Sequence, residues 1–534
     1  MKCLIASRRF AACVATVIGF SVASSAANFF DWTGEAGDGL WSTPGNWNSS
    51  DQKFPPAGGG YFLTKSGPFT VTLDETYTIG DIKVSAGTEA SMPYVTLIGG
   101  ELDVKGRFGV GYSEAYGYAT GTSTYPCWRY AQCGSLVTTG TTIRVGTPTA
   151  RAVFVGVGAG GSDGNATTKG WLTMNGGVFE AYVKNAWFGY NGQNSISATG
   201  IFDARTVPNG VLDSAGSLGV GRGYASTRIG QVLLGTNWTV RVGSPAAANG
   251  SLVVGTYFNY ASDCSADGLF SMPGGSFEAY VSTISLGDTM NCARPTGKGL
   301  IKLEGLTNVV LVATNSVLLG RNTRSTSEGQ TVFAEIDAST CTNVTFETPS
   351  LTMNTTYLQS GRTTHGVLRL GRGAGTVGSV TMGNVAGTAI ARQYALIDLK
   401  GFQMTLTNEV RVAGCGIVSN DVNGVSSGFA LNETATLAQS DGKMYVTFSR
   451  DPEGLFKPVS QARAEDCYWG FKWAGDHVSD VQALIDAGKL VVDTTGLSAK
   501  FLAKYALYYS AKDDTTYLGV PVVPVSSGMK VLFR

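Results

Sequence analysis

The chain has 534 residues, enough for several ordinary domains or one elongated domain, and 72 of them are glycine, about twice the average usage. Only 15% of the residues are charged whereas 43% are hydrophobic, which excludes a disordered chain. Lysine plus arginine and aspartate plus glutamate number 39 each, so the zero net charge gives no electrostatic reason to expect a nucleic-acid or anionic-membrane partner.

Residues 1–27 have the pattern of a secretory signal peptide. A positive region around Arg8 and Arg9 precedes the apolar run 10–22, and small residues follow at 24–27. The apolar run is too short for a stable membrane span, and no later stretch reaches about 20 apolar residues. We therefore expect a mature chain that is secreted or held at the cell surface and has no transmembrane segment.

Residues 28–92 are predicted to form an N-terminal cap. Trp32, Trp41 and Trp47 lie there among glycine and asparagine residues. One interpretation is a hydrophobic plug over the first unit of the fold. The other is a glycan-binding surface, because exposed aromatic rings stack on sugars, and its partner would be an extracellular polysaccharide or a cell-surface component.

Residues 93–425 repeat one loose pattern, in which alternating apolar residues, a glycine or glycine pair, a second alternating run and an apolar–glycine step follow one another. Alternation with a period of two indicates strands, and glycine marks the turns between them. Most copies are 30 to 41 residues long. The copies start near Tyr94, Gly134, Gly170, Gly200, Gly230, Gly268, Gly299, Gln330, Gly366 and Tyr394.

Two copies are especially alike. Residues 170–183 and 268–281 are identical at nine of fourteen positions and both end in Phe-Glu-Ala-Tyr-Val. The Gly-Gly pair in each is predicted to be a corner, with the preceding Met and the following Phe facing the core. The two copies are three units apart, so Glu180 and Glu278 are expected about 14 Å from each other along the axis.

A unit of this size does not bury an apolar face alone, whereas stacked units share one continuous core. The sequence therefore predicts an all-β fold, a parallel β-helix (β-solenoid) of about ten glycine-rich coils. About three short strands fit in each unit, which favours the β-helix over a β-propeller with its four strands per blade. An antiparallel barrel or sandwich is the third alternative.

The composition changes after the repeats, and residues 426–534 are predicted to form a small α+β C-terminal cap. Residues 443–448 alternate as a strand does. Residues 479–489 are predicted to form a helix that stops at Gly488, because glycine favours the left-handed conformation at helix ends. Residues 497–509 are predicted to form a second helix.

The opening pattern W-x-G-x5-L-W-x4-N-W at residues 32–47, followed by glycine-rich G-x-L-x-M-x-G-G units, resembles secreted bacterial β-helix proteins of the autotransporter-associated β-strand repeat type. The resemblance covers about residues 30–415. It implies extracellular presentation as a stalk or adhesive passenger, and self-assembly is possible. Such passengers are followed by a membrane barrel, and the tail is not expected to form one.

The sequence assigns no catalytic residue, no metal ligand and no cofactor. Histidine occurs only at positions 365 and 477, and both are interpreted as local polar or loop residues. Asp513 and Asp514 are an adjacent acidic pair in the tail, whereas the calcium site of a lyase needs a larger cluster of carboxylates. Residues 159–166 approach a calcium-loop motif only once.

Arginines follow the apolar–glycine step in three units. Arg222, Arg321 and Arg372 could share one face as a basic stripe for acidic glycans, or they could be solvated loop positions.

The cysteines fit architecture better than catalysis. Seven remain after the signal peptide, an odd number, which leaves at least one free or paired between chains. Cys264 and Cys292 lie at similar places in neighbouring units and are predicted to form a disulfide between coils. Cys127 and Cys133 bracket one loop and could pair locally.

The sequence thus favours a secreted or surface-bound structural or adhesive protein without catalytic activity. The alternatives are a polysaccharide-active lyase or glycosidase and a non-catalytic glycan-binding protein on the same scaffold.

Overall fold

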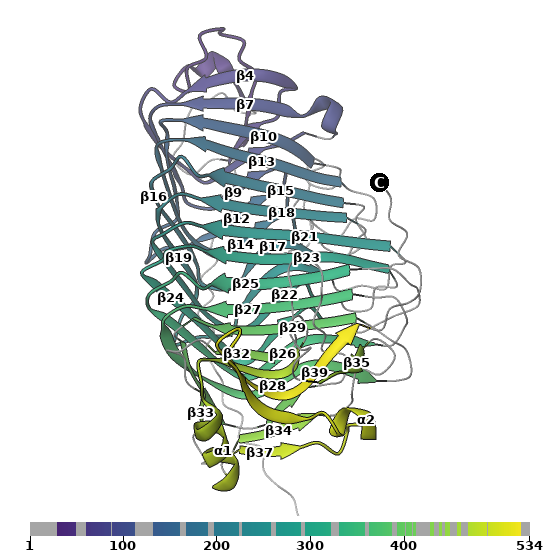
Figure 1. Ribbon diagram of the computed structural model, residues 1–534. Coiled ribbons are helices and arrows are strands. Elements are labelled where there is room, and N and C mark those ends of the chain that lie inside the picture. Colours follow the sequence, from purple (N-terminus) through teal and green to yellow (C-terminus); the bar gives the residue numbers. More distant parts are fainter. Residues whose placement is uncertain are drawn as a thin grey trace, which may run out of the picture.

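Parallel strands wind around one apolar core, which confirms the predicted β-solenoid (Figure 1). The structure is a computed structural model. It describes residues 29–49, 60–86, 88–112, 132–160, 167–190, 197–223, 227–257, 263–289, 294–321, 331–357, 363–386, 392–400, 402–407, 409–412, 428–431, 437–439, 444–448, 456–460, 468–488 and 490–524. The predicted signal peptide lies outside these residues.

Each coil contributes one strand to a 16-stranded sheet. Its parallel part consists of β4 (Gly67–Thr72), β7 (Pro93–Ile98), β10 (Gln132–Thr139), β13 (Thr167–Asn175), β15 (Ser197–Ala204), β18 (Thr227–Leu234), β21 (Asp263–Met272), β23 (Arg294–Leu303), β25 (Thr331–Ala338), β27 (Thr363–Leu370), β29 (Arg392–Leu399) and β32 (Gly428–Leu431). All ten predicted unit starts fall in these strands or next to them, so the repeat boundaries were placed correctly.

The rest of each coil belongs to a 23-stranded sheet with two rows of strands. The first row holds β5 (Thr76–Ile79), β8 (Glu101–Val104), β11 (Thr142–Val145), β16 (Asn209–Ser214), β19 (Asn237–Gly243), β30 (Phe402–Leu406) and β33 (Leu437–Gln439). The second row holds β1 (Phe29–Trp32), β3 (Gly60–Leu63), β6 (Asp81–Val84), β9 (Arg107–Val110), β12 (Ala152–Val157), β17 (Leu218–Gly223), β20 (Ser251–Tyr257), β31 (Glu409–Val412), β34 (Met444–Phe448) and β37 (Leu490–Asp493). In five coils a single longer strand runs through both rows. These strands are β14 (Val178–Phe188), β22 (Ser276–Leu286), β24 (Asn308–Leu319), β26 (Val344–Tyr357) and β28 (Gly373–Ala386).

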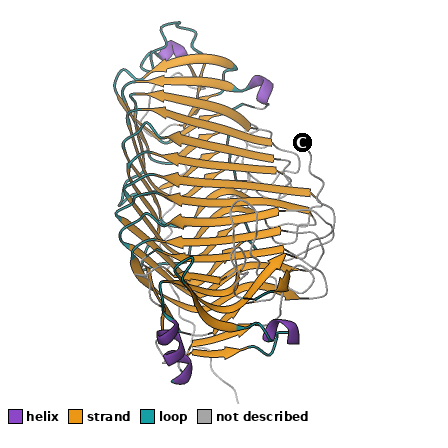
Figure 2. Ribbon diagram, in the orientation of Figure 1, coloured by secondary structure: helices purple, strands orange, loops and turns teal. Residues whose placement is uncertain are grey.

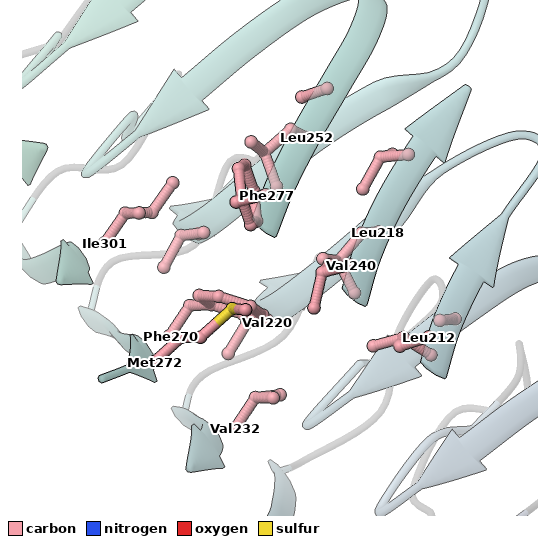
Figure 3. Packing of buried hydrophobic residues seen from close by; sticks show 14 of the residues in the cluster. Leu212, Leu218, Val220, Val232, Val240, Leu252, Phe270, Met272, Phe277 and Ile301 are labelled. Atoms are coloured by element: carbon pink, nitrogen blue, oxygen red, sulfur yellow. The ribbon is translucent and has the colours of Figure 1, made fainter. Parts of the chain in front are cut away.

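Alternation along the strands produces the core. In β13 and β14, Leu172, Met174, Phe179, Ala181 and Val183 are buried, whereas the residues that alternate with them are only partly covered. Figure 3 shows the same arrangement three coils on, where Phe270 and Met272 of one sheet point toward Val220 of the other. Each fully buried side chain of this kind contributes about 1.5–3 kcal/mol, so the stacked units are held by one continuous apolar column.

A glycine ladder crosses the 16-stranded sheet. Gly134, Gly170, Gly200, Gly230, Gly268 and Gly299 lie directly opposite one another in successive strands. Ala334, Gly366 and Ala395 continue the row.

A second glycine row ends the strands of the 23-stranded sheet. These corner glycines have φ between +54° and +64°, the left-handed region that favours glycine. They are Gly111, Gly158, Gly189, Gly221, Gly255 and Gly287.

The two rows approach each other backbone to backbone. A Cβ atom on Gly200 would lie 2.0 Å from the nitrogen of Gly189, and one on Gly158 would lie 1.6 Å from the oxygen of Thr199. The Gly189 N–H donates to the oxygen of Val157 at 2.9 Å, so the corner also continues the hydrogen bonding from coil to coil. We call this contact the glycine seam.

The corner position is not always glycine. Asn354 occupies the corner position with φ of +55° and is buried, and both polar atoms of its amide lack a hydrogen bond. A Cβ atom added to Gly366 would lie 2.8 Å from the Asn354 Oδ1 atom.

The two ends of the rod differ from its middle (Figure 2). At the N-terminal end, β2 (Trp47–Ser49) pairs antiparallel with β1, between the short helices η1 (Pro44–Asn46) and η2 (Glu89–Ser91) in the chain. Strands β4, β5 and β6 already pair in parallel with β7, β8 and β9, so coil stacking begins within residues 28–92.

The C-terminal end combines a mixed sheet with two helices. Strands β36 (Tyr468–Ala474), β38 (Ala506–Ser510) and β35 (Phe456–Pro458) pair antiparallel with β39 (Thr515–Pro524). Helix α1 (Val478–Asp486) confirms the predicted helix, and Gly488 follows it with φ of +65°. The prediction of a helix over 497–509 is wrong beyond α2 (Ala499–Leu502), because the tyrosines of β38 pair with β39 instead.

The close backbone contact at the glycine seam predicts that one added methyl group there strongly lowers the stability of the fold. Gly200→Ala is expected to destabilise the fold by about 3 kcal/mol or more, because the new Cβ would overlap Val157 and Gly189 backbone atoms. Gly45→Ala is the control, since its Cβ would meet only the Ala36 Cβ at 3.4 Å. Urea unfolding followed by circular dichroism measures both, and equal midpoints would contradict the seam.

The exception at Asn354 predicts a gain. Asn354→Gly removes the strain of a left-handed non-glycine residue and an unpaired buried amide, which costs about 1–3 kcal/mol of stability. The extra backbone entropy that glycine loses on folding offsets about 0.5–1 kcal/mol of this gain. The melting temperature is expected to rise. Asp514→Gly serves as the control because Asp514 also has positive φ but is exposed and accepts a hydrogen bond from Tyr509. A lower melting temperature for Asn354→Gly would refute this interpretation.

Candidate functional site

The two similar segments form equivalent corners three coils apart. Residues 170–183 run through β13 into β14, and residues 268–281 run through β21 into β22. The Gly-Gly pairs lie at the corners with positive φ, as predicted. Ala181 and Val183 face the core, whereas Glu180 and Tyr182 point outward. Glu278 has the equivalent place in β22.

The outward residues of this row form a charged face. In it, Asp103, Arg144 and Glu180 lie directly opposite one another in β8, β11 and β14. The Arg144 guanidinium lies 2.8 Å from Glu101, 3.7 Å from Asp103 and 3.3 Å from Glu180. One arginine therefore binds carboxylates from both neighbouring coils.

The charged face continues two coils on with a second network. Arg241 of β19 lies 3.0 Å from Glu278 and 3.9 Å from Asp213. Arg151 donates to the Asp213 carboxylate at 2.8 Å and to its main-chain oxygen at 3.0 Å. The Asp213 side chain is only 8% exposed, so this carboxylate depends on its two arginines for charge compensation.

The electrostatics of the charged face stabilise the charged form of Arg144 and the neutral forms of Tyr182 and Tyr280. The hydrogen bond that Arg144 donates to Glu101 raises the pKa of Arg144. Burial, and then the Glu180 charge, raises the pKa of Tyr182; burial and Glu278 do the same for Tyr280. Neither phenol is therefore set up as a base near neutral pH, which a polysaccharide lyase would need.

Glu180 and Glu278 do not form a pair. Glu278 is in register with Arg241, Asp213 and Tyr182 of the preceding coils, so three rungs separate the two repeated acids, about 14 Å along the axis. Glycoside hydrolysis requires carboxyl groups about 5–10 Å apart, and these two residues do not meet that requirement.

The three N-terminal tryptophans are buried. Trp41 is fully buried, with its ring centroid 4.7 Å from that of Trp47 and 5.1 Å from that of Tyr61. The Trp47 indole N–H donates to the main-chain oxygen of Trp41 at 2.8 Å. Trp32 lies edge-on against Trp47. Stacking on a sugar needs an exposed ring face, so the burial of these rings favours the hydrophobic plug over the glycan-binding surface. The glycan-binding role itself stays an untested prediction.

The three arginines of the suggested basic stripe have different surroundings. Arg222 lies over the Trp187 ring at 5.3 Å, and Arg321 makes a bidentate pair with the buried Asp288 at 3.0 and 2.7 Å. Arg372 is exposed. Two of the three thus have local structural partners.

The histidines and the adjacent acids also have local contacts. His477 is the N-cap residue of α1 and lies 3.2 Å from Asp480. His365 lies in β27, 5.3 Å from the Phe333 ring centroid, so its assignment to a loop is wrong. Asp513 and Asp514 accept hydrogen bonds from Tyr517 and Tyr509 in the β38–β39 hairpin. Within the described ranges no three His, Cys, Asp or Glu residues gather as a metal site.

The cysteine predictions remain open. Cys133 is buried, and Cys127 lies outside the described residues. Cys292 also lies outside them, and only the backbone of Cys264 is described, paired with Pro295. Both proposed disulfides stay predictions.

Sequence reasoning missed the charged face. Arg144, Asp213 and Arg241 sit at outward positions of neighbouring units, and the alternation of opposite charges appears only when the units are aligned in their true register. Aligning the copies on the ladder glycines and reading the outward positions across them would have revealed it.

Comparison with known proteins found no match: no protein family, curated protein or solved structure matches the chain. Over the described part of the chain, no helix has the length and apolar character required to cross a bilayer.

The ion-pair networks predict that removing either of two paired aspartates lowers the free energy of unfolding by different amounts. Asp213→Ala is expected to cost about 3 kcal/mol, because it leaves Arg151 and Arg241 facing each other without their shared carboxylate. Asp203→Ala is the matched control, and a loss below about 1 kcal/mol is expected because its partner Arg205 is 66% exposed and two residues away in the chain. Urea midpoints compare the variants, and equal losses would show that inter-coil pairing adds nothing.

Proposed function

We propose that this chain is a secreted structural or adhesive β-solenoid that acts without catalysis. One observation carries the proposal: the outward carboxylates of the charged face bind arginines of neighbouring coils. Glu180 and Glu278, the acids that the repeats make most conspicuous, are each within 3.3 Å of such an arginine. These side chains link neighbouring coils, which is a structural role.

The sequence supports the location. The basic and apolar pattern of residues 1–27 has the features of an export signal, and the repeats resemble autotransporter-associated β-strand repeats of bacteria. Export to the cell surface or medium would present the long face of the solenoid to extracellular polysaccharide or cell-surface components. The proposed role is to span distance and display that face.

Two measurements test the proposal. Purified protein is incubated with acidic and neutral polysaccharides, and new reducing ends and the ultraviolet absorbance of unsaturated products are followed. No turnover is expected. In parallel, protease added to intact cells that express the full chain is expected to digest it.

The contradicting results are specific. Turnover that Glu278→Gln abolishes while the melting temperature stays unchanged would identify an enzyme. Asp203→Asn, an acid in a local surface pair, controls for the loss of one carboxylate. Protection of the chain from protease until the cells are lysed would contradict surface location.

A further inference from the structure

Arg228 is an ionisable side chain inside the solenoid wall. It occupies an inward position near the start of β18, where its register neighbours on the adjacent coils are Ala198 and Ala266. The residue is 0% exposed. The alanine side chains at both register positions offer the guanidinium no hydrogen-bond acceptor.

The guanidinium has no hydrogen-bond acceptor among the described residues. None of its three nitrogen atoms makes a hydrogen bond, and its central carbon lies 4.8 Å from the centre of the Tyr257 ring. The neighbouring Thr256 hydroxyl is also buried and unpaired. A buried charge in this state is strongly destabilising unless an opposite charge accompanies it.

A buried carboxylate of the following coil, Asp288, is already paired. Asp288 is linked to this corner because its main-chain oxygen accepts a hydrogen bond from the Tyr257 N–H at 2.7 Å. Its carboxylate, however, accepts both hydrogen bonds of the Arg321 fork and one from Ser285 at 3.0 Å. It therefore has no capacity left to neutralise a second guanidinium.

Arg228 remains a cation at neutral pH. Burial lowers its pKa to about 9, which is still above physiological pH. Deprotonation therefore does not remove the unpaired charge.

We propose that Arg228 is the centre of a buried anion-binding site, lined by Tyr257 and Thr256, that takes one small inorganic anion such as chloride or phosphate. A guanidinium offers several parallel N–H donors to such an ion, and a hydroxyl adds another. Complete burial excludes the carboxylates of a polysaccharide, whose chain does not fit inside the wall. The anion would be a structural component of the coil rather than a substrate.

The test measures binding directly. The full-length protein is dialysed into a buffer of large organic ions and then equilibrated with labelled phosphate or, separately, labelled chloride. The expected result is saturable binding of about one anion per chain and a melting temperature that rises with the logarithm of anion concentration. Arg228→Met is expected to weaken binding by about 10- to 100-fold, as the loss of charge-assisted hydrogen bonds implies.

The control and the opposing outcomes separate this site from general salt effects. Arg372→Met removes an exposed positive charge and is expected to bind the anion like the unaltered protein. Equal binding by Arg228→Met, or no saturable binding by the unaltered protein, would overturn the proposal. If Arg228→Met does not fold, Arg228→Lys, which keeps the charge without the planar fork, and the binding curve of the unaltered protein decide the question.

Discussion

The close approach of two backbones along the glycine seam is the constraint on which the solenoid depends. Where a strand of the 23-stranded sheet ends, the chain must turn through a left-handed residue and pass within contact distance of the next sheet. A Cβ on Gly189 would lie 2.0 Å from the oxygen of Ile229, and one on Gly230 would lie 2.0 Å from the nitrogen of Gly221. Repetition of this contact explains why glycine recurs at two fixed positions in successive coils.

Electrostatics reinforce what the seam and core establish. The parallel stacking places outward residues of successive coils about 4.8 Å apart, so a row of like charges would weaken the rod and a row of alternating charges strengthens it. The chain places Asp103, Arg144 and Glu180 in one such row. The same logic makes Arg228 conspicuous, because its neighbours in the inward row carry no charge, and charge balance there requires something beyond the described side chains.

The sequence predicted the architecture well and the sites poorly, for a physical reason. Alternation and glycine spacing are local signals, so the unit starts at Gly170 and Gly200 and the burial of Phe179 followed from them. Ion pairs between coils join residues 30 or more positions apart, and unequal copy lengths hide them until the register is known. The hairpin at Ala506–Ser510 was missed because its pairing with β39, rather than local helix propensity, decides its conformation.

The register of the coils is tested most directly by a distance across several of them. Thr96 and Lys302 both point outward from the 16-stranded sheet and are linked through Val137, Thr173, Asp203, Leu233 and Ser271 by six steps of register. Spin labels at these two positions, attached through non-natural amino acids to spare the cysteines, should give a single narrow distance near about 29 Å by pulsed electron paramagnetic resonance. A broad distribution, or a narrow one far from that value, would contradict parallel stacking on the glycine seam.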